Sequence, residues 1–195
     1  MIDRFGGALS LDFVNTAGWH LSDVPNDHLT DAGTLREWAR DAGIAVGQVP
    51  PLRRVVTVRE ALYRVFTSRI AGRAPEPDDL RVVNRTLARA MAAATLIADG
   101  PDLRWEWPGS PPELVLWAVV RDAAELLTSP RAGQIRMCGN DPCGWLFLDP
   151  RGRRRWCSMR GCGNRVKANR YYRNHADAAD RLGPPGGRSG RPVKH

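Results

Sequence analysis

Apolar side chains between residues 30 and 127 recur at steps of three and four, the spacing that places them on one face of a helix. The pattern predicts four amphipathic helices, over residues 30–43, 50–72, 78–94 and 112–127. Thr30 or Asp31 is suited to cap the start of the first helix. Gly43 and Gly72 are suited to end the first and second helices, because glycine readily takes the left-handed backbone found at helix C-termini.

Alternation of apolar and polar residues predicts strands at two places. Leu9, Leu11 and Phe13 alternate with polar residues, which is typical of a short strand near the start of the chain. The segment TLIADGPDLRWEW, residues 95–107, alternates on both sides of an Asp-Gly turn and predicts a β-hairpin. Residues 1–130 are therefore expected to form a mainly α domain with short β elements.

All four cysteines lie in one short segment, as two C-x4-C pairs with thirteen residues between them. Four thiolates complete the tetrahedral shell of a structural Zn²⁺, and the glycines beside each pair permit tight turns around a metal. The sequence therefore predicts one structural zinc ion with four ligands: Cys138, Cys143, Cys157 and Cys162.

Residues 131–182 are expected to form a small treble-clef-like zinc finger. The first cysteine pair should lie on a knuckle, followed by a β-hairpin with its turn at residues 149–152. The second pair should lie at the start of a helix over residues 163–182. A module of this size buries too little apolar surface to fold alone, so metal binding would supply the missing stability.

Three other interpretations of the cysteines stay open. They could be buried free thiols without a metal. They could form a redox pair, although neither pair has the C-x-x-C spacing typical of redox motifs. They could hold a catalytic zinc, but such sites keep an open position and usually include histidine or carboxylate ligands. The nearest histidine, His175, lies more than three helical turns after Cys162.

The charge is concentrated in the cysteine segment and the residues after it. Residues 131–195 carry 15 basic and 4 acidic residues, a net charge of +11, whereas residues 1–130 carry 14 basic and 17 acidic residues, a net charge of −3. A field concentrated in this way favours a polyanionic partner. Residues 183–195 are rich in Gly, Pro and Arg and are expected to form a disordered basic tail.

Arginine, lysine and asparagine side chains around the second cysteine pair are suited to contact phosphate or bases, because they offer several hydrogen-bond donors at once. The candidate nucleic-acid-binding residues are Arg153, Arg154, Arg155, Arg165, Lys167, Asn169, Arg170 and Arg173. Alternatively, some of these arginines pair with acids of the first domain. Arg165 and Asn164 could also be structural, with Asn164 hydrogen-bonded to a cysteine sulfur or to backbone.

Two segments carry a family resemblance. WCSMRGCGNRVKANRYY, Trp156 to Tyr172, resembles the CGNR-type zinc finger, which is named for residues 162–165. LDFVNT, Leu11 to Thr16, resembles the start of the ABATE domain that usually precedes this finger. The resemblance implies a bacterial protein of a group regarded as stress-induced transcription regulators.

These observations predict a zinc-dependent DNA-binding protein, a transcription regulator whose first domain senses a ligand or mediates homodimer formation. The alternative is a zinc-stabilised module that binds RNA or an acidic protein. Asp12, Asn15 and Thr16 are the candidates for a ligand pocket, although Asn15 and Thr16 could simply form a turn and cap. No nucleophile elbow, Ser-His-Asp pattern or phosphate loop occurs in the sequence, so an enzyme is not expected. No secretory signal or long apolar segment is recognisable, so a cytoplasmic protein without a membrane partner is expected.

Overall fold

The computed structural model describes residues 4–181, so the expected tail over residues 183–195 lies outside the described part of the chain. Helices dominate the described part of the chain, and its strands form three separate two-stranded antiparallel sheets. Within residues 4–181, no helix combines the length and apolar character needed to cross a membrane.

The four predicted helices are confirmed. They are α2 (Ala32–Asp41), α3 (Leu52–Ile70), α4 (Pro77–Ala93) and α5 (Leu114–Thr128). Asp31 caps α2 by accepting hydrogen bonds from the amides of Gly33 and Thr34, at 2.7 and 2.9 Å, and the Thr34 hydroxyl accepts from the Asp31 amide. Gly43 follows α2 with a φ of +77°, which is the left-handed backbone that glycine permits.

The predicted strand at the start of the chain is wrong, because residues Leu9–Val14 form a short helix, α1. A strand that is half exposed would leave its polar side chains in water, but here Ser10 and Asp12 are buried together with their apolar neighbours. The Asp12 carboxylate accepts a hydrogen bond from the Gly6 amide at 2.8 Å, and Asp122 accepts one from the Ser10 amide at 2.7 Å. Tertiary packing on all sides thus overrides the alternating pattern.

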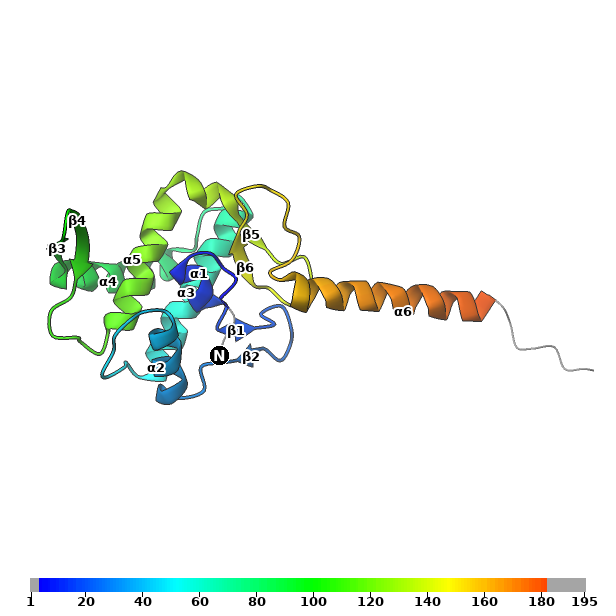
Figure 1. Cartoon of the computed structure of the whole chain (residues 1–195), viewed down its shortest axis with the longest axis horizontal. Coiled ribbons are helices and arrows are strands. Elements are labelled where there is room, and N and C mark those ends of the chain that lie inside the picture. The colour runs from blue at the N-terminus through cyan, green and yellow to red at the C-terminus, as the bar shows by residue number, and fades with distance from the viewer. Residues whose placement is uncertain (1–3, 182–195) are drawn as a thin grey trace, which may run out of the picture.

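Pairs of short strands follow α1 and α4. β1 (Ala17–Gly18) pairs with β2 (Asn26–Asp27) within the segment after α1. The predicted hairpin is confirmed as β3 (Thr95–Asp99) and β4 (Asp102–Glu106), joined by the turn at Gly100. This hairpin lies at the end of the molecule opposite to α6 (Asn164–Arg181) (Figure 1).

The main core is built around α3, which packs against α1, α4 and α5. Phe13, Leu62, Phe66 and Leu116 are among the largest side chains with no exposed surface. The core also takes in residues from beyond the helical domain, because Leu146 lies in the same cluster. The polypeptide on both sides of residue 130 therefore shares one apolar core.

The C-terminal part consists of the 3₁₀ helix η1 (Pro130–Gln134), the strands β5 (Ile135–Met137) and β6 (Leu146–Leu148), the π-helical turn η2 (Met159–Gly163) and α6. β5 packs on α3, and β6 packs on α1. A hairpin and a ligand-bearing helix are present as predicted, and this is the fold class expected of the zinc finger.

The position of the hairpin differs from the prediction. Its strands flank the knuckle, which forms the connection between β5 and β6, rather than following it. Residues 149–156, predicted to form the turn and the second strand of a hairpin, are a loop. Asp149 holds this loop by accepting a hydrogen bond from the Arg154 amide at 2.8 Å, so the backbone there is tied to a side chain instead of a partner strand.

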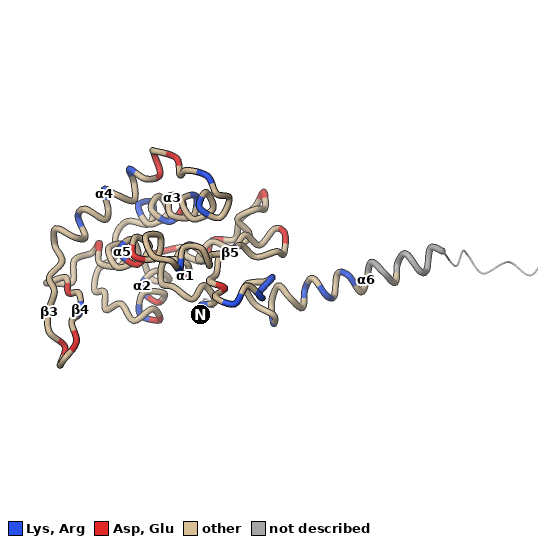
Figure 2. Tube along the Cα trace, turned by 90° about the horizontal axis from the view of Figure 1, so that it is seen from above, with Lys and Arg blue, Asp and Glu red and all other residues tan. Residues whose placement is uncertain are grey.

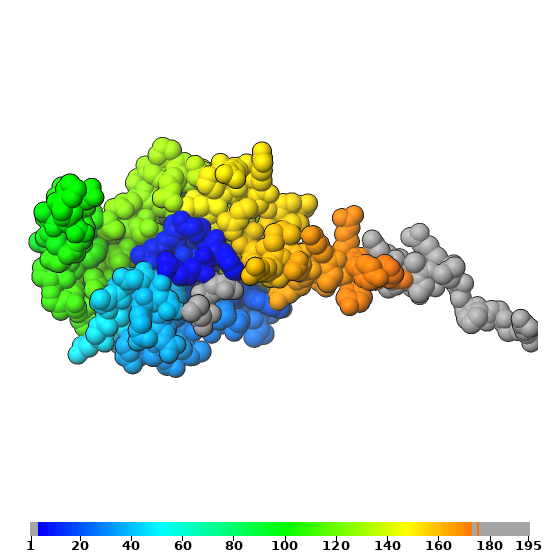
Figure 3. Space-filling model, in the orientation of Figure 1, coloured from blue at the N-terminus to red at the C-terminus, as the bar shows by residue number. Residues whose placement is uncertain are grey.

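Helix α6 extends away from the rest of the protein (Figures 1 and 3). It packs chiefly against η2, the turn that precedes it. Its side chains from Lys167 to Tyr172 are all exposed. The described surface of α6 from Lys167 to Tyr172 is therefore available to a partner.

Candidate metal centre and nucleic-acid interface

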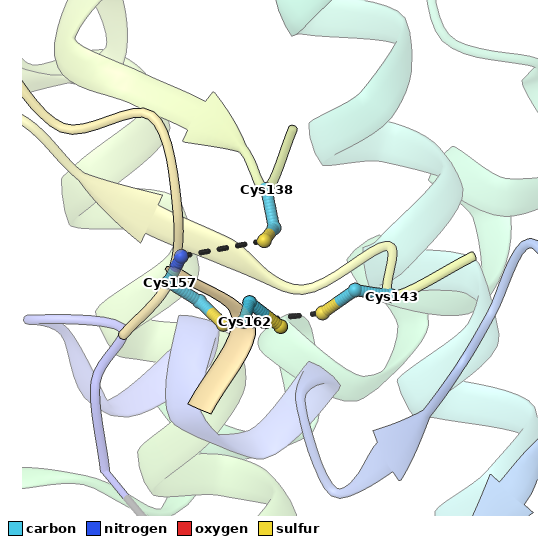
Figure 4. A group of neighbouring side chains, drawn as sticks. All are labelled: Cys138, Cys143, Cys157 and Cys162. Carbon is cyan, nitrogen blue, oxygen red and sulfur yellow. Dashed lines mark hydrogen bonds between the residues drawn. The ribbon is translucent and has the colours of Figure 1, made fainter. Parts of the chain in front are cut away.

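The four cysteine sulfurs meet at the junction of the knuckle, the loop after β6 and the turn η2 that precedes α6 (Figure 4). All four residues are buried, and their sulfurs lie within 4.8 Å of one another. The Sγ atoms of Cys143 and Cys157 are 3.9 Å apart, and those of Cys157 and Cys162 are 3.6 Å apart. The structure therefore brings together the four residues that the spacing predicted as ligands.

These separations fit one tetrahedral zinc ion. Zn–S bonds of about 2.3 Å at tetrahedral angles place neighbouring sulfurs about 3.8 Å apart. The two measured separations fall on either side of this value. A closed set of four thiolates leaves no position for water or substrate, so the centre is a structural zinc site.

Amide groups stabilise the sulfurs as thiolates. The Cys157 amide donates a hydrogen bond to the Cys138 sulfur at 3.4 Å, and the Asn140 side-chain amide donates one to the Cys162 sulfur at 3.4 Å. Such bonds disperse the negative charge of a metal-bound thiolate. The amide that reaches a sulfur is thus that of Asn140, whereas Asn164 is exposed. The sequence does not indicate this role of Asn140. An asparagine two residues after Cys138 is indistinguishable from an ordinary turn residue.

Without a metal, the buried thiols must share their protons. Hydrogen bonds from the Cys143 and Cys157 thiols lower the pKa of Cys138 to about 2. The pKa of Cys143 is raised to about 12, chiefly because its thiol donates to the Cys138 thiolate, and the pKa of Cys157 is raised for the same reason. Zinc binding must therefore displace protons from the site.

The knuckle is anchored to the helical domain by Tyr63 of α3. Its hydroxyl donates a hydrogen bond to the Gly144 carbonyl at 3.0 Å, and its ring stacks on His20 with centroids 3.8 Å apart. Burial, with a smaller effect of the nearby Glu60 charge, raises the pKa of Tyr63 to about 12, so the phenol keeps the proton it donates. Gly144 has a φ of +70°, and a Cβ there would lie 2.9 Å from both His20 Cβ and Tyr63 Oη. Only glycine fits this close approach.

Asn15 anchors the strand that follows. Its side chain donates to the Leu146 carbonyl and accepts from the Leu146 amide, each at 2.8 Å. Thr16 donates its hydroxyl to the Phe13 carbonyl at 2.7 Å, and Asp12 binds the Gly6 amide. The three predicted pocket residues are thus engaged inside the fold, and Asp12 alone borders a shallow surface hollow.

Among the basic candidates, Arg154 differs from its neighbours. Its guanidinium donates hydrogen bonds to the carbonyls of Phe5, Leu148 and Cys157, at 3.2, 3.2 and 2.6 Å, and lies 4.2 Å from the centre of the Phe147 ring. These contacts tie the N-terminal segment to β6 and to a metal ligand. The guanidinium of Arg154 is therefore largely occupied by the fold itself.

The other basic candidates fall into two groups. Arg165 lies with its guanidinium 5.2 Å from the centre of the Trp19 ring, so it contacts the helical domain. The remaining candidates with described side chains are exposed, and no carboxylate of the described residues pairs with them: Arg153, Arg155, Lys167, Asn169 and Arg170. The Arg173 side chain lies outside the described part. Arg160, between the second pair of cysteines, belongs to the same surface but was missed, although its position in a basic segment could have indicated it.

Comparison with known families assigns both parts of the chain. Residues 7–130 match the ABATE family, described as "Putative stress-induced transcription regulator", and residues 134–175 match the CGNR zinc finger. No curated protein matches the chain. The family resemblance seen in the sequence is confirmed for both segments, and the first match covers more than half of the chain. The protein therefore belongs to the ABATE family and carries a CGNR zinc finger after its ABATE domain.

Proposed function

We propose that the protein binds duplex DNA through a basic surface on its zinc finger and acts in transcriptional control. The basic surface is defined here by Arg153, Arg155, Arg160, Lys167 and Arg170. It combines the loop after β6, the turn η2 and the exposed side of α6. The ABATE family description supports the regulatory part of this proposal.

The observation that carries the proposal is the projecting helix α6. A helix about 10–12 Å across fits a major groove about 12 Å wide, provided that the protein body does not cover it. Residues 150–176 contain nine basic residues and no acidic residue. Figure 2 shows the basic positions along the described part of α6 and at its base, with no acidic position between them. Such a helix can approach a polyanion without meeting a repulsive charge.

The loop before η2 is suited to hold phosphate. A groove of about 640 Å³ is lined by Phe5, Trp156 and the arginines of residues 153–155 and 160. Because Arg154 is fixed by its contacts with backbone carbonyls, the neighbouring arginines extend from an ordered backbone. Less conformational entropy is then lost when these arginines bind phosphate.

A salt titration with a fluorescent duplex tests the proposal. Binding of the zinc-loaded protein should weaken steeply with salt, because each phosphate contact releases counterions. Arg153→Gln and Lys167→Gln should each weaken binding and lower the salt slope by about 1. The matched control is Arg89→Gln, an exposed arginine on α4, which should leave both quantities unchanged.

Two results would contradict the proposal. One is the absence of duplex binding at low salt by protein that retains one zinc ion per chain. The other is an affinity that is the same in the finger variants and in the Arg89→Gln control. Tighter binding to an RNA hairpin than to duplex DNA under matched salt would identify RNA as the partner instead.

A further inference from the structure

A cavity separates the β1–β2 ribbon from the base of α6. Its volume is about 480 Å³, within the range of small-molecule sites. Three metal ligands, Cys143, Cys157 and Cys162, line it together with residues of the helical domain. Trp19, Trp145, Arg160 and Arg165 also line it. The cavity is therefore formed jointly by the ABATE domain and the zinc finger.

The walls of the cavity are aromatic. Trp19 leaves 42% of its surface exposed and has a φ of +59°, an unusual value for a residue with a side chain. The fold maintains this conformation, and the Arg165 guanidinium lies over the indole, 5.2 Å from the centre of its ring. The Trp145 indole donates a hydrogen bond to the Ala17 carbonyl at 3.1 Å, which fixes its ring. Two ordered indoles favour a flat aromatic ligand, since aromatic faces stack on one another.

Arg160 and Arg165 are the two charged side chains among the described residues that line the cavity, and a guanidinium only donates hydrogen bonds. Within the described part of the chain, no aspartate or glutamate lines the cavity. Arg160 and Arg165 form no ion pair with any carboxylate in the described residues. A guanidinium binds a carboxylate through two parallel hydrogen bonds, and Arg165 would do so beside an aromatic ring. The cavity thus presents a donor pair for one planar anionic group.

The metal centre limits the charge of the ligand. Four thiolates around one Zn²⁺ carry a net charge of −2, and Arg160 and Arg165 together carry +2. The local charge is then close to balance, so a single carboxylate gains bidentate hydrogen bonds with little net repulsion. A bound monoanion leaves the site with a net charge of about −1, whereas a phosphate monoester dianion leaves about −2 and so more uncompensated charge. The balance favours a monoanion.

We propose that this cavity binds a planar aromatic monocarboxylate, with its ring on Trp19 and its carboxylate on Arg165. The ligand would join the ABATE domain to the first turn of α6 and so alter how the helix meets its partner. Only this regulatory consequence rests on the proposed DNA binding. The binding of the ligand is independent of it.

Isothermal titration of the zinc-loaded full chain with 2-naphthoate tests the site. The dissociation constant should lie below about 1 mM, and both Trp19→Gly and Arg165→Gln should raise it about tenfold. Glycine at position 19 accepts the positive φ, so that variant removes the ring without straining the backbone. Arg89→Gln is the matched control and should bind as the parent does. Zinc content measured on each variant verifies that the centre is intact.

Three matched compounds test whether the site requires an aromatic ring and a single negative charge. Cyclohexanecarboxylate lacks the aromatic face, 2-naphthol at neutral pH lacks the charge, and 2-naphthyl phosphate carries a second charge; each should bind at least about tenfold more weakly. No saturable binding of 2-naphthoate up to about 5 mM, or equal affinity in the Trp19 and Arg165 variants and the parent, would overturn the proposal. Duplex binding is measured separately with and without 2-naphthoate. Ligand binding without DNA binding would refute the proposed function and leave this site standing.

Discussion

Replacing Asn15 by alanine examines how firmly the zinc finger is built into the helical domain. Asn15 is fully buried in the segment after α1, and it hydrogen-bonds both backbone groups of Leu146 in β6. Leu146 is itself fully buried. No water can therefore replace the lost side chain without entering the core.

The expected loss of stability follows from the Leu146 amide and carbonyl, which both lose their hydrogen-bond partner. Each buried backbone group left without a hydrogen bond costs about 1–3 kcal/mol, and the missing side chain also leaves a small cavity. Asn15→Ala should therefore lower the free energy of unfolding by about 3–5 kcal/mol. This is a large fraction of the about 5–15 kcal/mol that stabilises an ordinary domain.

Urea unfolding of the zinc-loaded protein measures this loss, with tryptophan fluorescence and zinc release followed on the same sample. In the parent the two signals should change together, because β5 and β6 share the core of α1 and α3. Asn15→Ala should shift both transitions to lower urea. The control Asn84→Ala, at an exposed position of α4, should shift neither. Equal midpoints for the two variants would refute the assigned role of Asn15, and zinc release well before the fluorescence change would refute the shared core.

Two further predictions concern the metal and a buried ion pair. Removal of zinc by a strong chelator should lower the thermal midpoint by about 10–20 °C, measured by circular dichroism; a change of less than a few degrees would contradict a structural role. Asp27→Asn should lower stability by about 1–2 kcal/mol at neutral pH, since it removes the bidentate carboxylate partner of Arg59, which is 3% exposed and keeps Glu60 and the Thr16 hydroxyl as partners. Burial alone would raise the pKa of Asp27, but hydrogen bonds from Arg59 and from the Leu29 amide lower it overall. Its contribution is therefore present above the unfolded-state pKa of about 3.9 and is lost as the pH falls through the folded-state pKa. Acid unfolding curves should show this loss in the parent and not in the variant, and parallel curves would argue against it.

The sequence predicted the elements whose signal is local. The helical spacing of α3 and α4, the capping residue Asp31 and the Asp-Gly turn of β3–β4 all depend on neighbours within a few positions, and they are confirmed. The cysteine spacing likewise predicted the ligand set, because a tetrahedral metal accepts few arrangements of two close pairs.

The predictions that the structure contradicts share one cause, which is contacts between residues far apart in the sequence. Leu9–Val14 alternates like a strand, but it is a helix in which residues 10–14 are buried. The Asp12 carboxylate accepts from the Gly6 amide, and the Ser10 amide donates to Asp122. The sequence predicts a hairpin after the knuckle because the residues that follow Leu148 are typical of a β-turn. Asp149 and Arg154 use that turn to form a loop instead. Nothing near Asn15 in the sequence indicates a bond to a residue 131 positions away.

The same long-range contacts change what the zinc ion does for this protein. In an isolated finger, binding of zinc stabilises only the finger, by about 10–16 kcal/mol for structural sites in small peptides. Here the knuckle is held by Tyr63, β6 by Asn15, and the loop after it by the contacts of Arg154 with Phe5. Zinc binding therefore also stabilises the helical domain. A change that destabilises that domain should in turn weaken zinc binding. Because α6 begins two residues after Cys162, this coupling determines whether the projecting helix has a fixed base from which to meet a partner.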